Sequence, residues 1–312
     1  MEEKKLIYGC MGLGGSWDKS PLTIDDQKKA DAVIETALSA GITHFDHADI
    51  YTFGKAEKVF GNFLNRNRSQ REKIFIQSKT GIVLQGGPMQ SSIYNLSGDY
   101  VISQVDRILS RLRIDYLDAL LLHRPDPLTS MENLAETLHL LKKIGKVKAF
   151  GVSNMSTNQI VLLQSYLNEP LIANQVELSL AHSMLLDLEV WVNREESPKE
   201  MGLRGLLNYS QLHTLSLQAY SPLAQGYYSK SNSSDKKNKG IVFFVKEMAE
   251  KYQTSISGIL LAWLWKIPAN IQPVIGTTNL GRIKESVDSM NINLTRKDWY
   301  SLWILAKETK LP

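Results

Sequence analysis

Four polar side chains in the first half of the chain are of the types that proton transfer needs. Asp46 and Tyr51 lie in FDHADIY, Lys79 in FIQSKTG and His123 in ALLLHRPD, each near the end of an apolar, strand-like run. The carboxyl ends of parallel strands meet at one face of an α/β barrel, so we expect these side chains to converge. A neighbouring cation favours phenolate and lowers the pKa of a tyrosine from about 10. The pattern therefore predicts Tyr51 as a proton donor with a lowered pKa.

Strand-like runs alternate with amphipathic segments along the chain. Eight apolar or β-branched runs occur, at residues 5–11, 42–48, 73–79, 116–123, 147–154, 172–179, 215–221 and 272–278. Between them, apolar residues recur three or four positions apart, which indicates helices, for example at 25–41, 56–67, 99–112, 131–145 and 243–253. Alternation of strand and helix predicts a parallel sheet, and eight repeats fit a closed (β/α)8 barrel. The predicted fold class is therefore α/β, a TIM barrel forming a single domain over residues 1–312.

A doubly wound open sheet is the structural alternative for the same alternation. It would place a dinucleotide on a glycine-rich turn between the first strand and a helix. The glycine-rich turn GCMGLGG, at residues 9–15, has the wrong spacing and leads into SWDKSP rather than a helix. The sequence therefore favours the closed barrel.

Local signals support this register. Thr23 can cap the first helix, with Asp26 three positions later, and Gly41 can end it. Two long connections, at 85–98 and 227–240, follow the third and seventh strands and are expected on the face that carries the site.

The end of the chain indicates one further element. Residues 295–310, TRKDWYSLWILAKETK, are typical of an extra C-terminal helix after the last barrel helix. We expect Trp299, Leu302 and Leu305 to pack on the scaffold.

Composition limits the class of protein. The 312 residues include 43% hydrophobic and 22% charged residues, as in ordered globular proteins. A net charge of +4, from 36 basic and 32 acidic residues, is too mild to predict nucleic-acid binding. Neither a signal peptide nor an apolar membrane segment is recognisable, so we expect a cytoplasmic protein. The single cysteine, Cys10, permits neither an internal disulfide nor a cysteine-based metal site.

No metal is expected. His44 and His47 in THFDHAD are three residues apart in a predicted strand, which places them on opposite faces.

The four polar residues, together with GVSN at 151–154, NQVELS at 174–179, AYSPLAQG at 219–226 and VIGTTNLGRIKES at 274–286, resemble an aldo-keto reductase. The resemblance runs from about residue 5 to residue 310, and LLLHRPDP is similar to a group of bacterial oxidoreductases in that family. It implies reversible, metal-free hydride transfer between NADPH and an aldehyde or ketone.

Carbonyl reduction builds negative charge on oxygen, so the site must supply a proton or strong hydrogen-bond donors. In the resemblance, Tyr51 is the acid, Lys79 tunes its pKa, Asp46 holds Lys79, and His123 orients the carbonyl.

The resemblance also implies the cofactor contacts. Ser153, Asn154 and Gln175 match residues that hold the nicotinamide carboxamide, and Tyr220 matches the aromatic residue that stacks on the ring. The other implied contacts are the first-strand turn (Gly9, Cys10, Met11), the pyrophosphate loop (Ser221, Leu223, Gly226) and the adenosine end (Thr277, Thr278, Arg282, Glu285). Arginine suits a 2'-phosphate, which predicts NADP(H) in preference to NAD(H). Cys10, Thr277 and Ser286 stand where many members have threonine, lysine and asparagine.

Two readings stay open for the residues around the predicted mouth. Trp17, Phe53 and Tyr94 could line an apolar substrate pocket or could pack within their loops. Arg124 could be a solvated surface residue or a contact for an acidic substrate.

The predicted function is reduction of a small carbonyl substrate. The alternative is a cofactor-binding, redox-sensing or regulatory subunit with slow turnover. Alcohol oxidation would use the same residues in reverse. Neither the substrate nor any protein partner is predicted.

Overall fold

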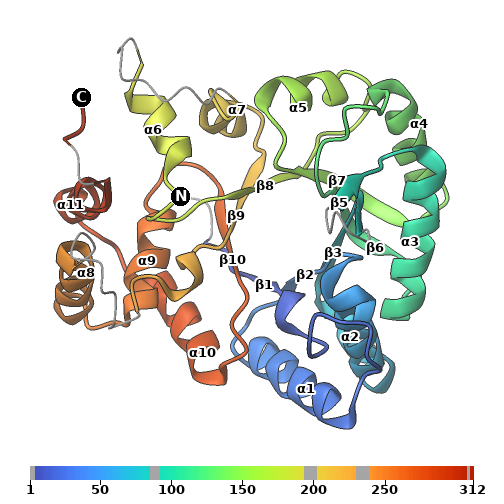
Figure 1. Cartoon of the computed structure of the whole chain (residues 1–312), viewed down its shortest axis with the longest axis horizontal. Helices are drawn as coiled ribbons and strands as arrows, with labels where there is room; N and C mark the ends of the chain where they lie inside the picture. The colour runs from blue at the N-terminus through green and yellow to red at the C-terminus, as the bar shows by residue number, and fades with distance from the viewer. Residues whose placement is uncertain (1–3, 85–91, 193–201, 230–238, 308–309) are drawn as a thin grey trace.

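A closed parallel barrel forms the centre of the protein. The computed structural model describes residues 4–84, 92–192, 202–229, 239–307 and 310–312. The barrel has the strand order β1-β10-β9-β8-β7-β6-β3-β2, and helices surround it (Figure 1). Its strands are β1 Ile7–Gly9, β2 His44–Asp46, β3 Phe75–Thr80, β6 Leu117–Leu122, β7 Val147–Ser153, β8 Ala173–Glu177, β9 Ser216–Tyr220 and β10 Ile271–Ile275. Each overlaps one of the eight predicted runs, and the predicted TIM barrel is confirmed.

The helices follow the strands in the expected alternation. They are α1 Ile24–Ser39, α2 Lys55–Arg66, α3 Gly98–Leu112, α4 Met131–Lys143, α5 Thr157–Gln164, α6 Met184–Val190, α7 Leu206–Leu212, α8 Lys239–Lys251, α9 Ile256–Trp265, α10 Leu280–Asp288 and α11 Arg296–Lys307. At the start of α1, Thr23 and Asp26 form the predicted reciprocal capping box. Gly41, just past the helix, has φ 88°, which a glycine adopts without steric cost.

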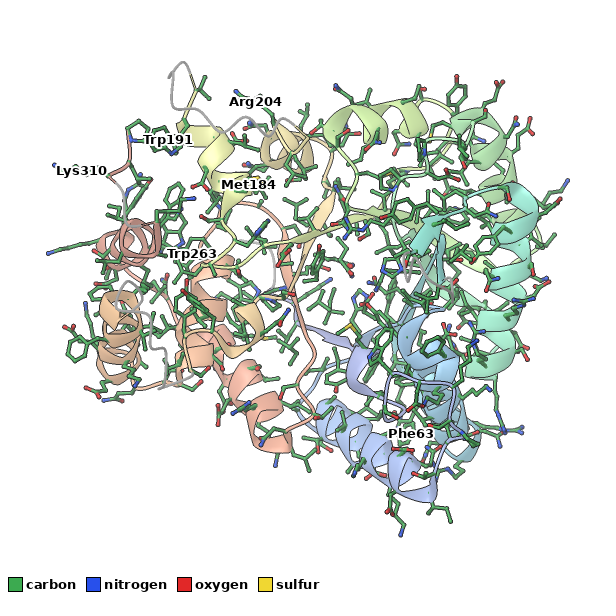
Figure 2. All side chains as sticks on the ribbon, viewed as in Figure 1. Phe63, Met184, Trp191, Arg204, Trp263 and Lys310 are labelled. Atoms are coloured by element: carbon green, nitrogen blue, oxygen red, sulfur yellow. The ribbon has the colours of Figure 1, made fainter. Side chains whose placement is uncertain are left out.

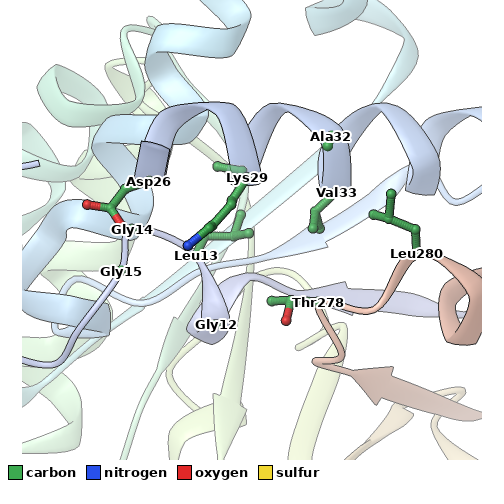
Figure 3. A pocket seen from close by; sticks show the side chains of 11 residues that line it. Gly12, Leu13, Gly14, Gly15, Asp26, Lys29, Ala32, Val33, Thr278 and Leu280 are labelled. Atoms are coloured by element: carbon green, nitrogen blue, oxygen red, sulfur yellow. The ribbon is translucent and has the colours of Figure 1, made fainter. Parts of the chain in front are cut away.

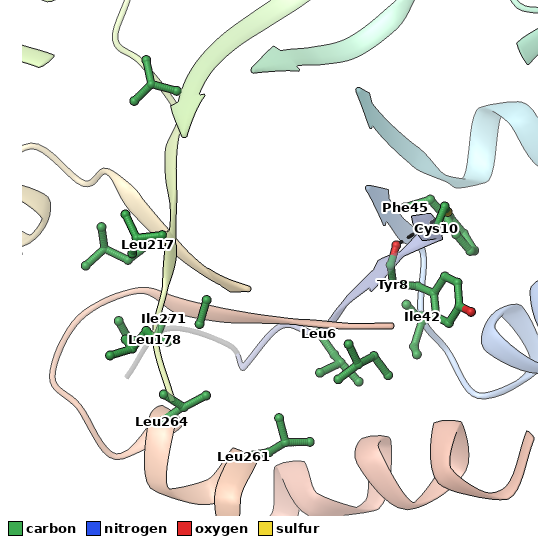
Figure 4. Packing of buried hydrophobic residues seen from close by; sticks show 14 of the residues in the cluster. Leu6, Tyr8, Cys10, Ile42, Phe45, Leu178, Leu217, Leu261, Leu264 and Ile271 are labelled. Carbon is green, nitrogen blue, oxygen red and sulfur yellow. Dashed lines mark hydrogen bonds between the residues drawn. The ribbon is translucent and has the colours of Figure 1, made fainter. Parts of the chain in front are cut away.

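The outward faces of the first strands pack against helices. The rings of Tyr8 and Phe45 lie 6.2 Å apart, and Phe45 lies 5.0 Å from Phe60 of α2. Figure 4 shows Tyr8, Cys10 and Phe45 gathered around β1 and β2. Successive side chains of a strand point to opposite faces, and Phe45 points outward. Its two neighbours in the strand, His44 and Asp46, therefore point into the barrel.

The barrel interior contains a layer of paired polar side chains. Gln77 Nε2 donates to Gln218 Oε1 at 2.8 Å, and Gln218 Nε2 donates to Gln77 Oε1 at 2.9 Å. His44 Nε2 lies 2.8 Å from Gln77 Oε1. His47 instead packs on Phe60 outside the barrel, with ring centroids 4.7 Å apart. The two histidines thus lie on opposite sides of the barrel wall.

The extra C-terminal helix is present as α11. Trp263 and Trp299 stack at 5.2 Å and donate their indole N–H groups to each other's carbonyls. Figure 2 shows Trp263 where α9 meets α8 and α11. Leu302 is buried as expected, but Leu305 is 40% exposed and Trp303 is buried instead. Leu305 lies about 120° around the helix from Trp299, away from the scaffold.

The long connection after β3 carries a small sheet that the sequence analysis did not predict. β4 (Ile82–Leu84) and β5 (Ser92–Tyr94) pair antiparallel. Their β-branched and aromatic residues favour a strand. Residues 85–91, and 230–238 of the other long connection, lie outside the described residues.

Within the described part of the chain, no helix is long and apolar enough to cross a membrane.

Candidate active site

A buried ion pair lies at the carboxyl end of the barrel. Lys79 Nζ lies 2.6 and 2.7 Å from the two carboxylate oxygens of Asp46, and their side chains are 0% and 1% exposed. Gln77 Nε2 and Gln175 Nε2 also donate to Asp46 Oδ1, at 2.6 and 3.2 Å. Buried charges are stable only when paired and hydrogen-bonded, and this set meets both conditions.

The pair keeps both members charged. Burial acts to raise the pKa of Asp46, but the Lys79 ammonium and the donated hydrogen bonds bring it below its ordinary value. Burial acts to lower the pKa of Lys79, yet Asp46 and the Tyr51 phenol raise it above its ordinary value. Lys79 is therefore a fixed, buried ammonium.

Tyr51 stands beside this ammonium. Lys79 Nζ lies 5.0 Å from the centroid of the half-buried Tyr51 ring. Burial raises the pKa of Tyr51 to about 12, and the lowering effect of Lys79 is opposed by Asp46. The predicted lowering of the tyrosine pKa is therefore wrong for the protein alone, because burial outweighs the effect of Lys79 and Asp46 further offsets that cation.

His123 completes the group that the sequence predicts to converge. Its ring lies edge-on to Tyr51, with centroids 6.3 Å apart and an interplanar angle of 82°. Burial, followed by the charge of Lys79, lowers the pKa of His123 to about 3. The imidazole is therefore neutral near pH 7 and can donate one hydrogen bond without adding charge.

The segment that carries Tyr51 has an unusual backbone. Thr52, Phe53 and Gly54 follow it with φ values of 44°, 57° and 81°. Thr52 Oγ1 donates to Leu13 O at 3.0 Å and accepts from Ala56 N at 3.0 Å. Left-handed backbone in residues other than glycine persists only where neighbours hold it, and it is common at functional sites.

Two of the three candidate mouth aromatics gather over Tyr51. Trp17 lies 6.4 Å from the Tyr51 ring and 6.4 Å from the Phe53 ring. Trp17 and Phe53 remain 47% and 40% exposed. Tyr94 is exposed on β5 and makes no ring contact with Tyr51 among the described residues. Trp17 and Phe53 are therefore in ring contact near Tyr51 and still partly open to solvent.

The predicted carboxamide contacts are joined by hydrogen bonds. Ser153 Oγ donates to Gln175 O at 2.8 Å, and Asn154 Nδ2 donates to Ser153 Oγ at 2.8 Å. Tyr220 OH donates to Asn154 Oδ1 at 3.2 Å. Tyr220 is half-buried.

Gln175 has a second set of partners that the sequence reading missed. Its Nε2 donates to Asp46 and, at 3.0 Å, to Gln218 Oε1, so it supports the buried ion pair. Gln77 and Gln218 belong to the same network and were also missed. Strand periodicity could have identified both. Gln77 lies two positions before Lys79, and Gln218 two positions before Tyr220, so each shares a strand face with an inferred site residue.

The predicted first-strand contacts differ in exposure. Gly9 and Cys10 are buried, whereas Met11 is exposed. A Cβ on Gly9 would lie 3.0 Å from Val274 Cγ1, so glycine permits close packing on β10. Burial also raises the pKa of the Cys10 thiol. A cofactor contact by Gly9 or Cys10 is thus limited to the main chain.

The predicted pyrophosphate loop follows β9 in a tight turn. Ser221 and Gly226 have φ values of 52° and 78°, and Gly226 N donates to Leu223 O at 3.0 Å. All three are partly exposed.

The predicted adenosine end lies at the start of α10. Thr278, Arg282 and Glu285 are exposed and Thr277 is half-buried, but Ser286 is fully buried and donates to Arg282 O. Ser286 therefore faces the protein.

A hollow of about 320 Å³ opens beside this adenosine end, and Tyr51 is not among its lining residues. Figure 3 shows it between the turn at Gly12–Gly15, the side of α1 with Lys29, and Thr278 with Leu280. A Cβ on Gly12 would lie 3.1 Å from Thr278 Cγ2, so a larger residue at this position would crowd Thr278 beside the hollow.

Arg124 lies against Tyr220 at the mouth of the site. Burial raises the pKa of Tyr220, and Arg124 counteracts this by its charge and a hydrogen bond. Arg124 is half-buried.

In the portion of the chain that the structure describes, no group of three or more His, Cys, Asp or Glu side chains could hold a metal ion.

Known proteins resemble this chain over nearly its full length. The model of the Aldo/keto reductase family matches residues 5–306. An uncharacterized oxidoreductase, YcsN, of Bacillus subtilis (strain 168) is 36% identical over 284 residues, 90% of this chain and 89% of that protein. 6-Dehydroglucose reductase of Agrobacterium fabrum is 33% identical over 309 residues, 98% and 95% of the two chains. Oxidoreductase YdhF of Escherichia coli (strain K12) is 31% identical over 272 residues, 86% and 84% of the two chains.

A solved structure shows the same fold. An aldo-keto reductase from Klebsiella pneumoniae in complex with NADPH superposes with a TM-score of 0.75 at 22% identity, covering 100% of this chain and 99% of that one.

Proposed function

The chain belongs to the aldo/keto reductase family, and from that premise we propose that it reduces aldehydes or ketones with NADP(H), with Tyr51 as the general acid. The observation that carries the proposal is the buried Lys79–Asp46 ion pair, whose ammonium lies 5.0 Å from the Tyr51 ring. A buried, fully paired cation beside a phenol open to the barrel mouth fits proton transfer better than a purely structural role.

The residues present fit a nicotinamide dinucleotide. The half-buried Tyr220 ring offers a stacking face, and Asn154 with Ser153 offers amide and hydroxyl groups beside it. Gln175 Nε2 already donates to Asp46 and Gln218, so its amide oxygen would meet a carboxamide N–H. When bound, the reduced cofactor supplies the hydride. Arg282, exposed at the start of α10, would contact the 2'-phosphate that distinguishes NADPH from NADH.

Tyr51 would protonate the carbonyl oxygen as negative charge develops on it. With a pKa of about 12, the phenol holds its proton at neutral pH and releases it only to a stronger base, such as a forming alkoxide. Lys79 would stabilise the phenolate left behind, and Asp46 keeps Lys79 oriented. Neutral His123 would donate a hydrogen bond to the same oxygen and so aim the carbonyl.

The mouth suggests the kind of substrate to test. Trp17 and Phe53 form an exposed aromatic wall beside Tyr51, and Arg124 adds a cation near Tyr220. Relatives at 33% and 30% identity are named 6-dehydroglucose reductases. Aromatic faces with nearby polar groups suit a hydroxylated aldehyde as well as an aryl aldehyde, so both belong in the panel.

The test is NADPH oxidation, followed by absorbance, with a panel of aryl aldehydes, ketones, quinones and 6-dehydroglucose. Cofactor affinity is measured in parallel by fluorescence titration. Turnover above about 1 s⁻¹ supports the reductase, because this lies within the usual enzyme range. Tight NADPH binding without turnover on any compound would contradict it and favour a cofactor-binding regulatory subunit.

A further inference from the structure

The outer face of β3 carries a second buried polar group, behind the strand face that carries Lys79. We call it the outer cluster, and it consists of Asp49, Glu57, Ser78, Thr80 and Arg111. Gln77 and Lys79 point into the barrel, so Ser78 and Thr80 point outward. Ser78 Oγ donates to Glu57 Oε1 at 2.8 Å, and Arg111 Nε donates to Glu57 Oε2 at 2.6 Å. Glu57 is therefore fully engaged by its own partners.

Asp49 binds two consecutive residues of β3. Thr80 Oγ1 donates to Asp49 Oδ2 at 2.7 Å, and Asp49 N donates to Lys79 O at 3.0 Å. The Asp49 side chain is buried, and its Oδ1 has no hydrogen-bond partner among the described residues. One residue thus fixes the loop after β2 to the strand end that presents the ammonium.

Asp49 lies two residues before Tyr51, at the start of the unusual segment. Tyr51 N donates to Ala48 O at 3.0 Å, and left-handed backbone follows at Thr52 and Phe53. On the far side of Tyr51, Thr52 is held by Leu13. On the near side, Asp49 fixes the backbone through its hydrogen bonds to Thr80 and Lys79. Such backbone needs support from both sides, because each left-handed residue other than glycine costs about 1 kcal/mol or more.

We propose that Asp49, as a carboxylate bonded to Thr80, is a positioning residue that sets the place of the Tyr51 phenol relative to the Lys79 ammonium. The proposal rests on the proposed function, because its main readout is the rate of carbonyl reduction. Asp49 does not touch the reacting atoms. It acts through the segment that carries Tyr51.

The surroundings of Asp49 make its hydrogen bond to Thr80 sensitive to pH. Burial raises the pKa of Asp49 to about 7; the Thr80 hydrogen bond and Arg111 lower it, and Glu57 raises it. Burial, together with the charge of Asp49, raises the pKa of Tyr100 on α3 to about 12. Tyr100 therefore stays neutral while Asp49 titrates. Burial also raises the pKa of Glu57, although Arg111 and the Ser78 hydrogen bond act to lower it.

Protonation of Asp49 weakens its hydrogen bond to Thr80. A charged acceptor forms a shorter and stronger hydrogen bond than a neutral one, so the Thr80 link is strongest to the carboxylate. A proton on Oδ1 would meet no acceptor among the described residues. We therefore expect kcat for carbonyl reduction to fall as the pH is lowered through about 7.

The experiment compares the pH profiles of kcat in four variants. Asp49→Asn should lower kcat by about tenfold to a hundredfold, the effect of small misplacement, with the NADPH Kd unchanged and the inflection near neutral pH lost. Thr80→Val removes a bond that favours the carboxylate, so the inflection should move to higher pH. Thr80→Ser keeps the hydroxyl and should restore the wild-type profile.

Asp118→Asn is the matched control. Asp118 accepts from Ile76 N at 2.9 Å and so links β6 to the opposite end of β3. The same substitution there should leave kcat and its pH profile unchanged.

Two results would overturn the proposal: an unchanged kcat in Asp49→Asn, or an unchanged inflection in that variant. If the wild type reduces no carbonyl, the proposed function fails, and stability then decides the state of Asp49. A folded pKa raised from about 4 to about 7 makes stability fall as the pH rises across that window. Urea unfolding of the wild type against Asp49→Asn should show this fall. A pH-independent difference would overturn the titration of Asp49.

Discussion

The two ends of the barrel are built from the same strands but differ in backbone conformation. Nine non-glycine residues of the described chain have positive φ, and six of them follow strands at the carboxyl end: Thr52, Phe53, Asn154, Ser221, Ala224 and Gln225. At the amino end, the turns at Gly41 and Gly145 use glycine, and two non-glycine residues, Arg113 and Thr214, have positive φ in the turns before β6 and β9. Backbone strain is thus concentrated at the end with the candidate site, where precise placement offsets its cost.

The charges at the two ends differ in the same way. At the carboxyl end, Lys79 and Asp46 are 0% and 1% exposed. At the amino end, Arg71 Nη2 lies 2.9 Å from Asp118 Oδ2, and the two side chains are 12% and 13% exposed. A deeply buried pair is costly to desolvate and adds little stability by itself. The comparison supports the proposal that the carboxyl end carries the chemistry, whereas the amino end of barrels of this type serves stability.

Lys79→Met should have the largest effect, because it changes the charge arrangement at the carboxyl end of the barrel. It removes the ammonium beside Tyr51 and leaves the Asp46 charge buried without a cation. We expect a loss of kcat of about a thousandfold and a fall in unfolding free energy of about 3–5 kcal/mol. Steady-state kinetics and urea unfolding measure the two effects. The double variant Asp46→Asn/Lys79→Met should regain stability but not activity. A stable single variant would contradict the account.

Acid should unfold the protein through the buried histidines near the site. Burial lowers the pKa of His44 to about 4 and those of His47 and His123 to about 3. Between these values and the ordinary pKa of about 6.5, the unfolded chain binds more protons, so stability falls as the pH falls. Each histidine contributes a slope of about 1.4 kcal/mol per pH unit. His47→Leu should flatten the acid limb in urea unfolding, whereas an unchanged slope would contradict a buried neutral His47.

Asp118→Asn tests whether the amino end affects stability without affecting activity. It weakens the bonds to Arg71 and Ile76 and should lower the unfolding free energy by about 1–3 kcal/mol. Because Asp118 lies far from Tyr51 along the barrel axis, kcat should stay at the wild-type value. A parallel loss of kcat would show that the two ends are not separable.

Arg282→Ala should give the smallest effect. Loss of a charge-assisted contact to a 2'-phosphate should raise the NADPH Kd by about tenfold, which is 1.4 kcal/mol. NADH lacks that phosphate, so its Kd should hardly change. Fluorescence titration with both cofactors measures this. If the wild-type Kd values differ by less than about threefold, the assignment of Arg282 is wrong.

Much of the architecture could be predicted from the sequence. Apolar runs bounded by helical periodicity predict all eight barrel strands, and the family inferred from the motifs is confirmed. The convergence of Asp46, Tyr51, Lys79 and His123 follows from topology alone, since parallel strands bring their carboxyl ends to one face. The single domain, the cytoplasmic location and the absence of nucleic-acid or membrane partners stay predictions.

Features that depend on three-dimensional packing could not be predicted. The direction of the Tyr51 pKa depends on how far Asp46 neutralises Lys79 and on burial, neither of which spacing reveals. The contact between Asp49 and Thr80 joins the loop after β2 to the end of β3, on a face that periodicity marks only as buried. The exposure of Leu305 depends on which side of α11 meets the scaffold.

The most direct test of the account is steady-state NADPH oxidation by Tyr51→Phe, which removes only the phenol oxygen. The account predicts a fall in kcat of about a hundredfold to ten-thousandfold, the usual worth of a general acid, with the NADPH Kd and the unfolding midpoint unchanged. An unchanged kcat in the folded variant would contradict the role of Tyr51 and, with it, the proposed mechanism.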